Sequence, residues 1–515
     1  MSESRVQKTI LNAKVNTVFF ILSIIITFFS RKIFLERLGT DFMGLTGTIG
    51  NLLALLNLAE LGIGTAVGVL LYKPLYEKKY DELSNIISVF GYLYRQIGKF
   101  ILLVAVLISL SLPLIFKDVS MSILVVFVLF YSYLFGTLLS YWVNFKQILL
   151  NADQKNYLVA SYYQSMGIIS QIIQMITAFY TGNVYLWILI NLLSNIGYSV
   201  ILNYKIKKIY PWLNIDLKRG RELLRTYKNI TTKSKQVFFH KIASFILNQT
   251  DQFLIFKFTS LSMVAYYSNY LLLVDKVIGL INNVLGSSSA GVGNLIAEGN
   301  QSKIKSVFWE LMGLRFYICG LVIISLMVCV EPFIIWWLGE EYILSPAVFN
   351  LLLLNTSITL IRPTVDMFLA GYGLFKDTWA PALEAILNLF ISIVLGLKWG
   401  ITGVLTGTLI STLLIVIIWK PFFLYNAGFK TSINEYIKGF LGFISCFVFS
   451  YGIVKLISHW LLLSENPDDI MNIIWNRIVV ISLFTVVYSL ILFVASAGVR
   501  RICIRFIPKL KSYGV

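Results

Sequence analysis

The feature that most constrains this chain is a series of apolar runs, each about 20 residues long, that recurs from near the N-terminus to Val499. A helix of that length crosses the hydrocarbon core of a bilayer. The mean hydropathy of +0.79 and the charged content of 13% agree, since soluble domains are roughly 25% charged. The sequence therefore predicts an all-α integral membrane protein, and the short breaks between runs leave no room for a separate soluble domain.

We expect fourteen membrane-spanning helices. The first run follows Arg5, Lys8 and Lys14 and lacks a small-residue cleavage site, so it is expected to remain as a helix and not to be removed as a signal peptide. The expected spans cover residues 15–35, 43–71, 84–115, 120–147, 157–180, 184–206, 236–257, 263–296, 306–337, 345–371, 378–397, 401–425, 437–460 and 472–498.

Basic residues are distributed unevenly over the segments between the spans. With a cytoplasmic N-terminus, 29 of the 43 Lys and Arg residues fall in inside segments and 7 in outside segments. The positive-inside rule then places both termini in the cytoplasm, and Lys420, Lys430 and Lys438 share one inside segment. This topology and attraction to anionic membrane lipid account for most of the net charge of +18, so we expect no binding to nucleic acid.

Two pairs of similar segments indicate an internal repeat. KNYLVASYYQS…TG (155–182) aligns with KDTWAPALEAI…TG (376–403) at an offset of 221 residues, and LPLIF aligns with EPFII, around Pro113 and Pro332, at an offset of 219. Each repeat would hold six spans, with a substrate site between the halves near the membrane midplane. The predicted order is an N-terminal six-helix bundle (1–209), a basic cytoplasmic linker (210–235), a second six-helix bundle (236–430), and two additional helices with a basic tail (431–515).

Ionisable residues within the spans are the candidates for function. A charge at bilayer depth costs at least ~2.5 kcal/mol on insertion scales, so it needs a partner or a wet cavity. Arg362 and Asp366 are four residues apart and can pair on one helix face. For each such residue a structural pair and a transport role remain open alternatives. The set is Glu60, Asp251, Asp275, Lys276, Arg315, Arg362, Asp366 and Glu384.

Glu60 stands out because it lies within NLAELGIGTAVG (57–68), inside an apolar run. Glycines at GxxxG and similar spacings accompany it and favour close helix packing over ligand contact. These glycines are Gly44, Gly47, Gly50, Gly64 and Gly68.

Motifs for enzymatic chemistry and metal binding are missing. GYLYRQIGKF lacks the spacing of a phosphate-binding loop, and GVGNLIAEG lies in an apolar helix instead of after a strand. The two histidines, His240 and His459, are far apart, and the four cysteines lack metal-ligand spacing. We expect no catalytic group, metal or cofactor, with energy coming from an ion gradient, the membrane potential or the substrate gradient. An integral-membrane polymerase or ligase, and a scaffold without transport, are weaker alternatives.

Three segments resemble the bacterial polysaccharide repeat-unit flippases of the Wzx type, within the multidrug/oligosaccharidyl-lipid/polysaccharide (MOP) exporter superfamily. They are residues 30–68, residues 240–299 and WWLGEEYIL (336–344). The resemblance implies two six-helix bundles around a central cavity, followed by two helices, in a bacterial cytoplasmic membrane. It also implies alternating access that moves undecaprenyl-diphosphate-linked oligosaccharide to the outer leaflet for capsule, exopolysaccharide or O-antigen-like polymer.

By that resemblance, cations in the cavity would bind the anionic lipid-linked substrate, and they map to Arg31, Lys241, Lys276, Arg315 and Arg362. Acidic residues would couple transport to protons or sodium, or orient these cations, and the candidates are Glu60, Asp251, Asp275 and Asp366. A polymerase of the same pathway is an implied partner. A lipid II-type flippase and an ion-coupled multidrug exporter are the alternative functions, and the cationic set argues against export of cations.

Overall fold

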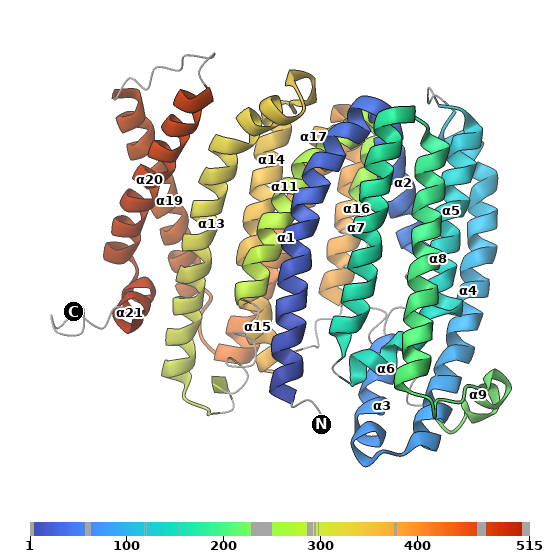
Figure 1. Cartoon of the computed structure of the whole chain (residues 1–515). Coiled ribbons are helices and arrows are strands. Elements are labelled where there is room, and N and C mark those ends of the chain that lie inside the picture. Colours follow the sequence, from blue (N-terminus) through green and yellow to red (C-terminus); the bar gives the residue numbers. More distant parts are fainter. Residues whose placement is uncertain are drawn as a thin grey trace. The chain divides into compact units, whose positions relative to one another are not determined.

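The computed structural model describes residues 5–56, 63–117, 119, 121–153, 155–227, 250–285, 292, 295–296, 298–374, 379–460 and 470–506. This part of the chain is almost entirely helical and contains no strand, as predicted (Figure 1). Eleven of its helices are long and apolar enough to cross a membrane, so the chain is a multi-pass membrane protein. The count of fourteen spans stays a prediction.

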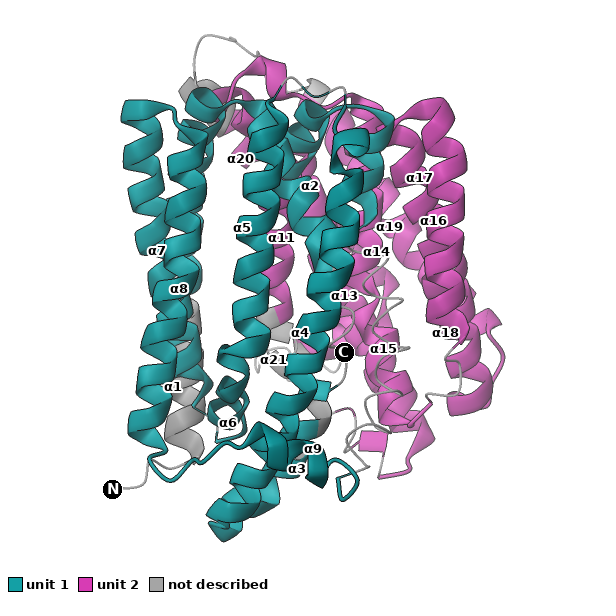
Figure 2. Ribbon diagram, turned by 90° about the vertical axis from the view of Figure 1, so that its right-hand side faces the viewer, with its two compact units in different colours: residues 1–268 teal, residues 269–515 magenta. Residues whose placement is uncertain are grey.

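The chain divides into two compact units, unit 1 (Met1–Ser268) and unit 2 (Asn269–Val515), which Figure 2 shows in different colours. The division falls within helix α11 (Leu261–Leu285). Residues 228–249, which include part of the predicted linker and the start of the predicted second bundle, lie outside the described residues. The predicted domain limits therefore stay predictions.

Unit 1 contains the residues predicted for the first six-helix bundle, together with residues 250–268 of the predicted second bundle. The expected span 43–71 covers two helices, α2 and α3, on either side of residues 57–62, which are not described. The helices are α1 (Arg5–Leu38), α2 (Thr40–Leu56), α3 (Ile63–Glu77), α4 (Tyr80–Ile115), α5 (Ile123–Trp142), the 3₁₀ turn η2 (Asn144–Lys146), α6 (Gln147–Ala152), α7 (Asn156–Thr181), α8 (Val184–Ile209) and α9 (Leu217–Leu223).

Unit 2 continues from α11 with the second repeat and two further long helices. The elements are α13 (Gln301–Trp337), the 3₁₀ turn η3 (Glu340–Tyr342), α14 (Pro346–Ile361), α15 (Pro363–Gly371), α16 (Trp379–Trp399), α17 (Ile401–Thr412), the π-helix η4 (Leu413–Trp419), α18 (Lys420–Phe423), the π-helix η5 (Leu424–Phe429), α19 (Asn434–Trp460), α20 (Ile470–Ala495) and α21 (Ala497–Phe506).

The helix boundaries support the internal repeat. Helices α4 and α13 have 36 and 37 residues, begin 221 residues apart, and carry Pro113 and Pro332 near their C-terminal ends. Helices α5 and α14 also end at equivalent points, Trp142 and Ile361, 219 residues apart. Each is followed by a short helix, α6 or α15. A helix break therefore follows α5 in the first repeat and α14 in the second.

The glycines at two turns show that the TG pairs aligned in the sequence are not structurally equivalent. Gly182 (φ 59°) and Gly400 (φ 57°) both adopt left-handed backbone conformations at the turns before α8 and α17. Gly403, which the sequence paired with Gly182, lies inside α17, where a Cβ would overlap the carbonyl of Leu395. The structural equivalent of Gly182 is therefore Gly400, because both turns require a residue with positive φ. Gly403 is needed for a different reason, since its contact with Leu395 leaves no room for a Cβ.

The glycines of α2 and α3 have the predicted packing role at Gly44 in α2 and lack it at Gly68 in α3. A Cβ at Gly44 would overlap the backbone of Leu261 at the start of α11, so this helix crossing requires glycine. Around Gly68 nothing lies within 4 Å of such a Cβ. The close approach predicted at Gly68 is therefore absent from the described structure.

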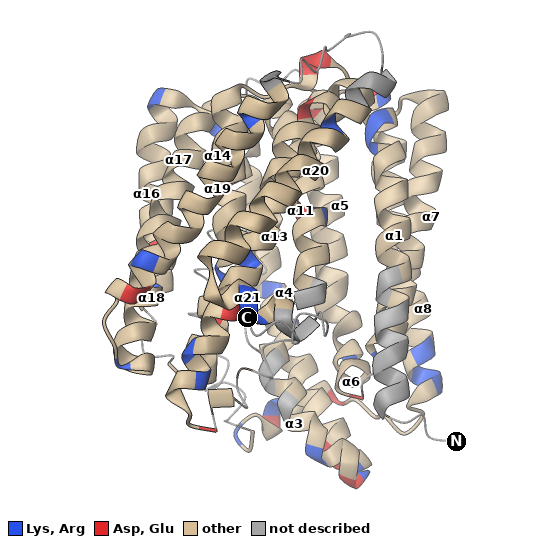
Figure 3. Cartoon of the chain, turned by 90° about the vertical axis from the view of Figure 1, so that its left-hand side faces the viewer, with Lys and Arg blue, Asp and Glu red and all other residues tan. Residues whose placement is uncertain are grey.

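Charged residues lie mainly near helix ends, whereas α5 and α7 are uncharged along their length (Figure 3). At the start of the predicted linker, α9 packs on α4. Gly220 of α9 lies against the backbone of Ser88, and the Asp216 carboxylate accepts hydrogen bonds from the backbone N–H groups of Lys218 and Arg219. This N-cap begins α9 within the predicted linker.

Candidate functional site

The candidate site lies in unit 2, where a broken helix places Arg362 between α14 and α15. Pro363 begins α15 and has no backbone N–H to donate, so the helical hydrogen-bond ladder is interrupted there. The Arg362 Nε donates a hydrogen bond of 3.0 Å to Asp366 Oδ2, one turn later. The ion pair that the four-residue spacing predicted is therefore confirmed.

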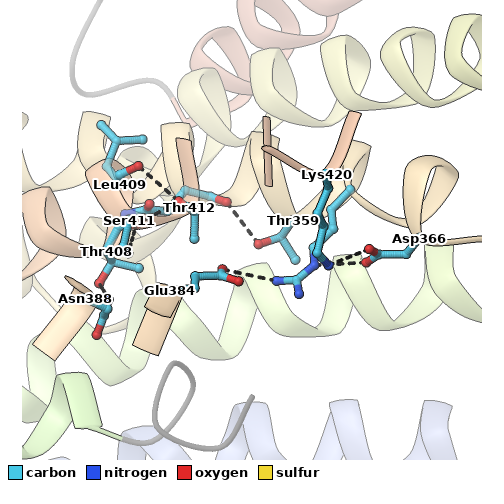
Figure 4. A network of polar contacts seen from close by, with 11 residues as sticks. Thr359, Asp366, Glu384, Asn388, Thr408, Leu409, Ser411, Thr412 and Lys420 are labelled. Carbon is cyan, nitrogen blue, oxygen red and sulfur yellow. Dashed lines mark hydrogen bonds and ion pairs between the residues drawn. The ribbon is translucent and has the colours of Figure 1, made fainter. Parts of the chain in front are cut away.

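Two further charges complete what we call the charged cluster, namely Arg362, Asp366, Glu384 and Lys420. The Lys420 Nζ, from α18, donates to Asp366 Oδ1 at 2.6 Å. The Arg362 Nη1 lies 3.6 Å from Oε1 of Glu384 in α16. Figure 4 shows Glu384, Asp366 and Lys420 converging from three helices. Two cations and two carboxylates make the cluster neutral.

The charged cluster has a buried side and a partly exposed side. The side chain of Glu384 is 0% exposed and that of Lys420 is 9% exposed, against 32% for Arg362 and 37% for Asp366. The carboxylate oxygens of Glu384 accept no hydrogen bond from any described residue, so its charge is compensated by the ion contact alone. A buried ion pair of this kind is costly to desolvate and becomes more costly when one partner is lost.

The α16–α17 hairpin holds Glu384 in place. Glu384, Asn388 and Ser392 are fully buried and follow one face of α16 at four-residue intervals. The Asn388 Nδ2 donates to Thr408 Oγ1 at 2.9 Å, and the Ser392 Oγ donates to the carbonyl of Val404 at 3.0 Å. A Cβ at Gly407 would overlap Ser392, so the two helices are in close contact and leave Glu384 little freedom to move away from Arg362.

Lys420 lies between the π-helices η4 and η5. Two π-helical segments on either side of one short α-helix are unusual, and π-bulges occur often at functional sites. The helix from Ile401 runs through Lys420 to Phe429. The apolar residues PFFLYNAGF continue the helix beyond Lys420, and the assignment of Lys420 to an inside segment stays a prediction.

Arg315 lies next to the break but outside the charged cluster. It belongs to α13, is 4% exposed, and its Nη1 donates to the carbonyl oxygen of Leu360 at 3.5 Å. Leu360 is the second residue before Arg362, so this contact supports the end of α14. The predicted contact between Arg315 and substrate stays a prediction.

The other predicted residues are distributed over several helices. Arg31, in α1, donates from Nη2 to the carbonyl of Ala265 at 3.2 Å within unit 1. Asp275 is exposed and Lys276 half-buried in α11, and Asp251 is half-buried in the helical residues 250–258. Lys241 and Glu60 lie outside the described residues. Of the predicted site residues, Arg362 and Asp366 therefore contact each other directly, and Glu384 and Lys420 complete their charged cluster.

Metal-binding chemistry was not expected from the sequence. In the described part of the chain, no group of three or more His, Cys, Asp or Glu side chains is arranged to hold a metal ion. The charged cluster also has only two carboxylates, and each lies against a cation, so ion pairing is the chemistry that its geometry supports.

Comparison with known proteins gives the class of fold. No family model matches the chain, and no curated protein matches it. The lipid II flippase MurJ, in its inward closed conformation, is similar with a TM-score of 0.65 and 18% identity, over 94% of this chain and 99% of that one. An inward-facing multidrug resistance MATE family transporter of the MOP superfamily is similar with a TM-score of 0.60 and 14% identity, over 79% and 96% of the two chains. The chain therefore has the fold of these membrane proteins, as predicted.

Proposed function

We propose that the protein is a flippase that moves undecaprenyl-diphosphate-linked oligosaccharide repeat units across the bacterial cytoplasmic membrane by alternating access. The observation that carries this proposal is the extent of the fold similarity. The lipid II flippase matches 94% of this chain, whereas the MATE transporter matches 79%. The long helices α19 and α20 follow the second repeat, so the whole architecture favours a lipid flippase over a drug exporter.

The segments that resemble repeat-unit flippases support an oligosaccharide on the lipid carrier. Arg362 would serve the diphosphate of such a carrier, because a guanidinium donates two parallel hydrogen bonds to phosphate oxygens. Its contact with Glu384 is the longest in the charged cluster, at 3.6 Å. An incoming phosphate would compete with Glu384 for Arg362, while Lys420 would keep Asp366 neutralised.

The experiment is deletion of the gene in its bacterial host, followed by complementation. We expect lipid-linked repeat units to accumulate at the cytoplasmic leaflet and surface polymer to disappear. Wild-type protein should restore the polymer, and Arg362→Ala should not. Lys398→Ala is the matched control, because Lys398 is an exposed cation at the end of α16 in the same unit. Normal surface polymer in the deletion strain, with no redundant transporter present, would refute the proposal.

A substrate panel separates the two alternatives. Purified protein in vesicles would be offered lipid II, a repeat-unit lipid and a cationic drug in parallel. Movement of the repeat-unit lipid alone supports the proposed function. Movement of lipid II alone would assign the chain to the lipid II-type alternative, and movement of the drug alone would make it a multidrug exporter.

A further inference from the structure

A second set of cations, far from the charged cluster in sequence, lies on α4 in unit 1. Arg95 and Lys99 are exposed and four residues apart, so they share one helix face. They line a groove of about 580 Å³ together with apolar residues of α4 and with Trp142, the last residue of α5. Every residue that lines this groove belongs to unit 1.

Neither cation of the groove has a counter-charge among the residues that the structure describes. For neither Arg95 nor Lys99 does the structure record a hydrogen bond or ion pair with any residue it describes. This differs from Arg362 and Lys420, which are each held by a carboxylate. A pair of unneutralised cations on a membrane helix is a site for an anion, and phosphate suits the arginine fork and the lysine point charge.

The apolar part of the groove begins one turn after Lys99. Leu103 and Leu107 line it and are each 59% exposed, and Leu110 and Leu114 continue the exposed row. From Phe100 to the end of α4 at Ile115 there is no charged residue. The 15 residues from Phe100 to Leu114 span about 22 Å, since a helix rises 1.5 Å per residue. That length exceeds one leaflet of a hydrocarbon core about 30 Å thick, so the row can accompany a complete acyl chain.

Trp142 lies at the polar end of the groove, together with Arg95 and Lys99. Its indole packs against Gly98, where a Cβ would overlap the ring, and the side chain remains 40% exposed. Tryptophan is enriched where headgroups meet acyl chains. The arrangement therefore presents cations and an indole at headgroup depth, followed by leucines at acyl-chain depth.

We propose that this groove binds an anionic phospholipid of the surrounding membrane, with its phosphate on Arg95 and Lys99 and an acyl chain along Leu103 and Leu107. The charge complementarity and the length of the apolar row select a membrane lipid as the occupant. A free phosphate would use only the polar end. The site does not depend on which substrate the protein transports.

The first test uses Trp142 as a reporter in the purified full-length protein. Vesicles would contain phosphatidylglycerol brominated on its acyl chains, which quenches nearby tryptophan fluorescence. The chain has 11 tryptophans, so the contribution of Trp142 is the difference between wild type and Trp142→Phe. We expect quenching of that contribution to saturate with brominated phosphatidylglycerol. Equal quenching by brominated phosphatidylcholine, at the same mole fraction, would overturn the charge-based assignment.

The second test removes the charges. Arg95→Gln with Lys99→Gln should weaken phosphatidylglycerol binding about 30-fold, since each basic residue near an anionic surface contributes about a factor of five. The matched control is Lys207→Gln with Lys208→Gln, which removes two exposed charges at the end of α8 in the same unit. It should leave binding at Trp142 unchanged. An equal loss in both double variants would overturn the site.

Two further experiments, a variant in the apolar half of the groove and a competition assay, test the same proposal. If the charge variant fails to fold, Leu107→Asn tests the acyl-chain half, and unchanged quenching in that variant would overturn the proposal. Undecaprenyl diphosphate and inorganic phosphate are offered as competitors. Displacement of phosphatidylglycerol by inorganic phosphate at comparable concentration would assign the site to a free anion. Preferential binding of undecaprenyl diphosphate would assign it to the lipid carrier, and either result would overturn the membrane-lipid assignment.

Discussion

The two repeats break a helix at equivalent points and stabilise the break with different chemistry. In unit 1, Asn144 follows α5, is 2% exposed, donates to Ser199 Oγ at 2.9 Å and accepts from Asn203 Nδ2 at 3.1 Å. In unit 2 the residue at the break is Arg362, which contacts Asp366 and Glu384, and Lys420 contacts Asp366. The first break shows that neutral hydrogen bonds suffice for this local fold. Under the proposed function, the charges at the second break have a further role, which is to bind the diphosphate of the substrate.

The hairpins beside the two breaks differ in the same way. Helix α7 carries no charged residue, and its Gln174 donates to the carbonyl of Trp187 in α8 at 2.9 Å. Helix α16, its counterpart in the second repeat, contains the fully buried Glu384. A buried carboxylate is costly unless it is paired, so Glu384 depends on its contact with Arg362.

The largest expected effect on stability is at Lys420. Lys420→Met removes the buried cation at 2.6 Å from Asp366 and should lower the free energy of unfolding by about 3 kcal/mol, because the charged cluster then holds one cation for two carboxylates, one of which is fully buried. Thermal or denaturant unfolding in detergent measures it. Lys420→Arg is the charge-preserving control, and the double variant with Asp366→Asn should recover part of the loss. A Lys420→Met protein as stable as wild type would show that the cluster is not a coupled unit.

The next effect compares glycines in the two hairpins. Gly403→Ala places a Cβ into the backbone of Leu395, whereas Gly197→Ala meets the flexible end of Met166. We expect a loss of about 3 kcal/mol for Gly403→Ala and less than about 1 kcal/mol for Gly197→Ala, since overpacking against backbone cannot relax. Unfolding midpoints of the two variants, measured side by side, check this. Equal midpoints would mean that the α16–α17 hairpin is not the more tightly packed one.

A smaller effect is expected at the neutral break. Asn144→Ala removes the hydrogen bonds to Ser199 and Asn203 and should cost about 1 to 2 kcal/mol. Transport per folded molecule should stay within twofold of wild type, because no charge is lost. The readouts are unfolding in detergent and polymer complementation normalised to the amount of folded protein. Loss of transport with stability intact would place function in unit 1 and reverse the comparison.

The smallest effect concerns the end of α6 in unit 1. The Tyr210 hydroxyl donates to Asp153 Oδ2 at 2.8 Å, and burial, together with the Asp153 charge, raises the pKa of Tyr210 above its ordinary value of 10.0. Tyr210→Phe should cost about 1 kcal/mol near neutral pH. The Tyr210 contribution is complete below pH 10 and is lost as the pH rises through the higher pKa of the folded state. Unfolding scans from pH 7 upward should therefore show wild type losing more stability above pH 10 than the variant, and parallel curves would contradict it.

The sequence was most informative where the signal is local. Apolar runs predicted the helices, and the four-residue spacing predicted the Arg362–Asp366 pair, because neighbours on a helix face follow from the helical period. Glu384 could be recognised as ionisable within a span. Its partner could not, since the packing of α16 beside the break depends on side-chain shape over many residues.

Two other residues at the helix breaks, Lys420 and Asn144, had weak or no sequence signal. Lys420 is a lysine beside aromatic residues, a pattern that also fits the end of a span, so only the apolar continuation to Phe429 indicated a buried position. Asn144 is an uncharged polar residue among many, and nothing in its neighbourhood predicts hydrogen bonds to Ser199 and Asn203. Contacts between residues distant in the chain become visible only in the folded structure.

The central claim is that the charged cluster at the helix break of unit 2 serves transport of a lipid-linked oligosaccharide. The most direct measurement is translocation of a labelled undecaprenyl-diphosphate-linked oligosaccharide by purified protein in vesicles, for wild type, Arg362→Ala and Asn144→Ala at equal folded amounts. We predict transport by wild type and Asn144→Ala and at least a tenfold loss for Arg362→Ala, about 1.4 kcal/mol. No transport by wild type above empty vesicles, or equal transport by all three proteins, would contradict the claim.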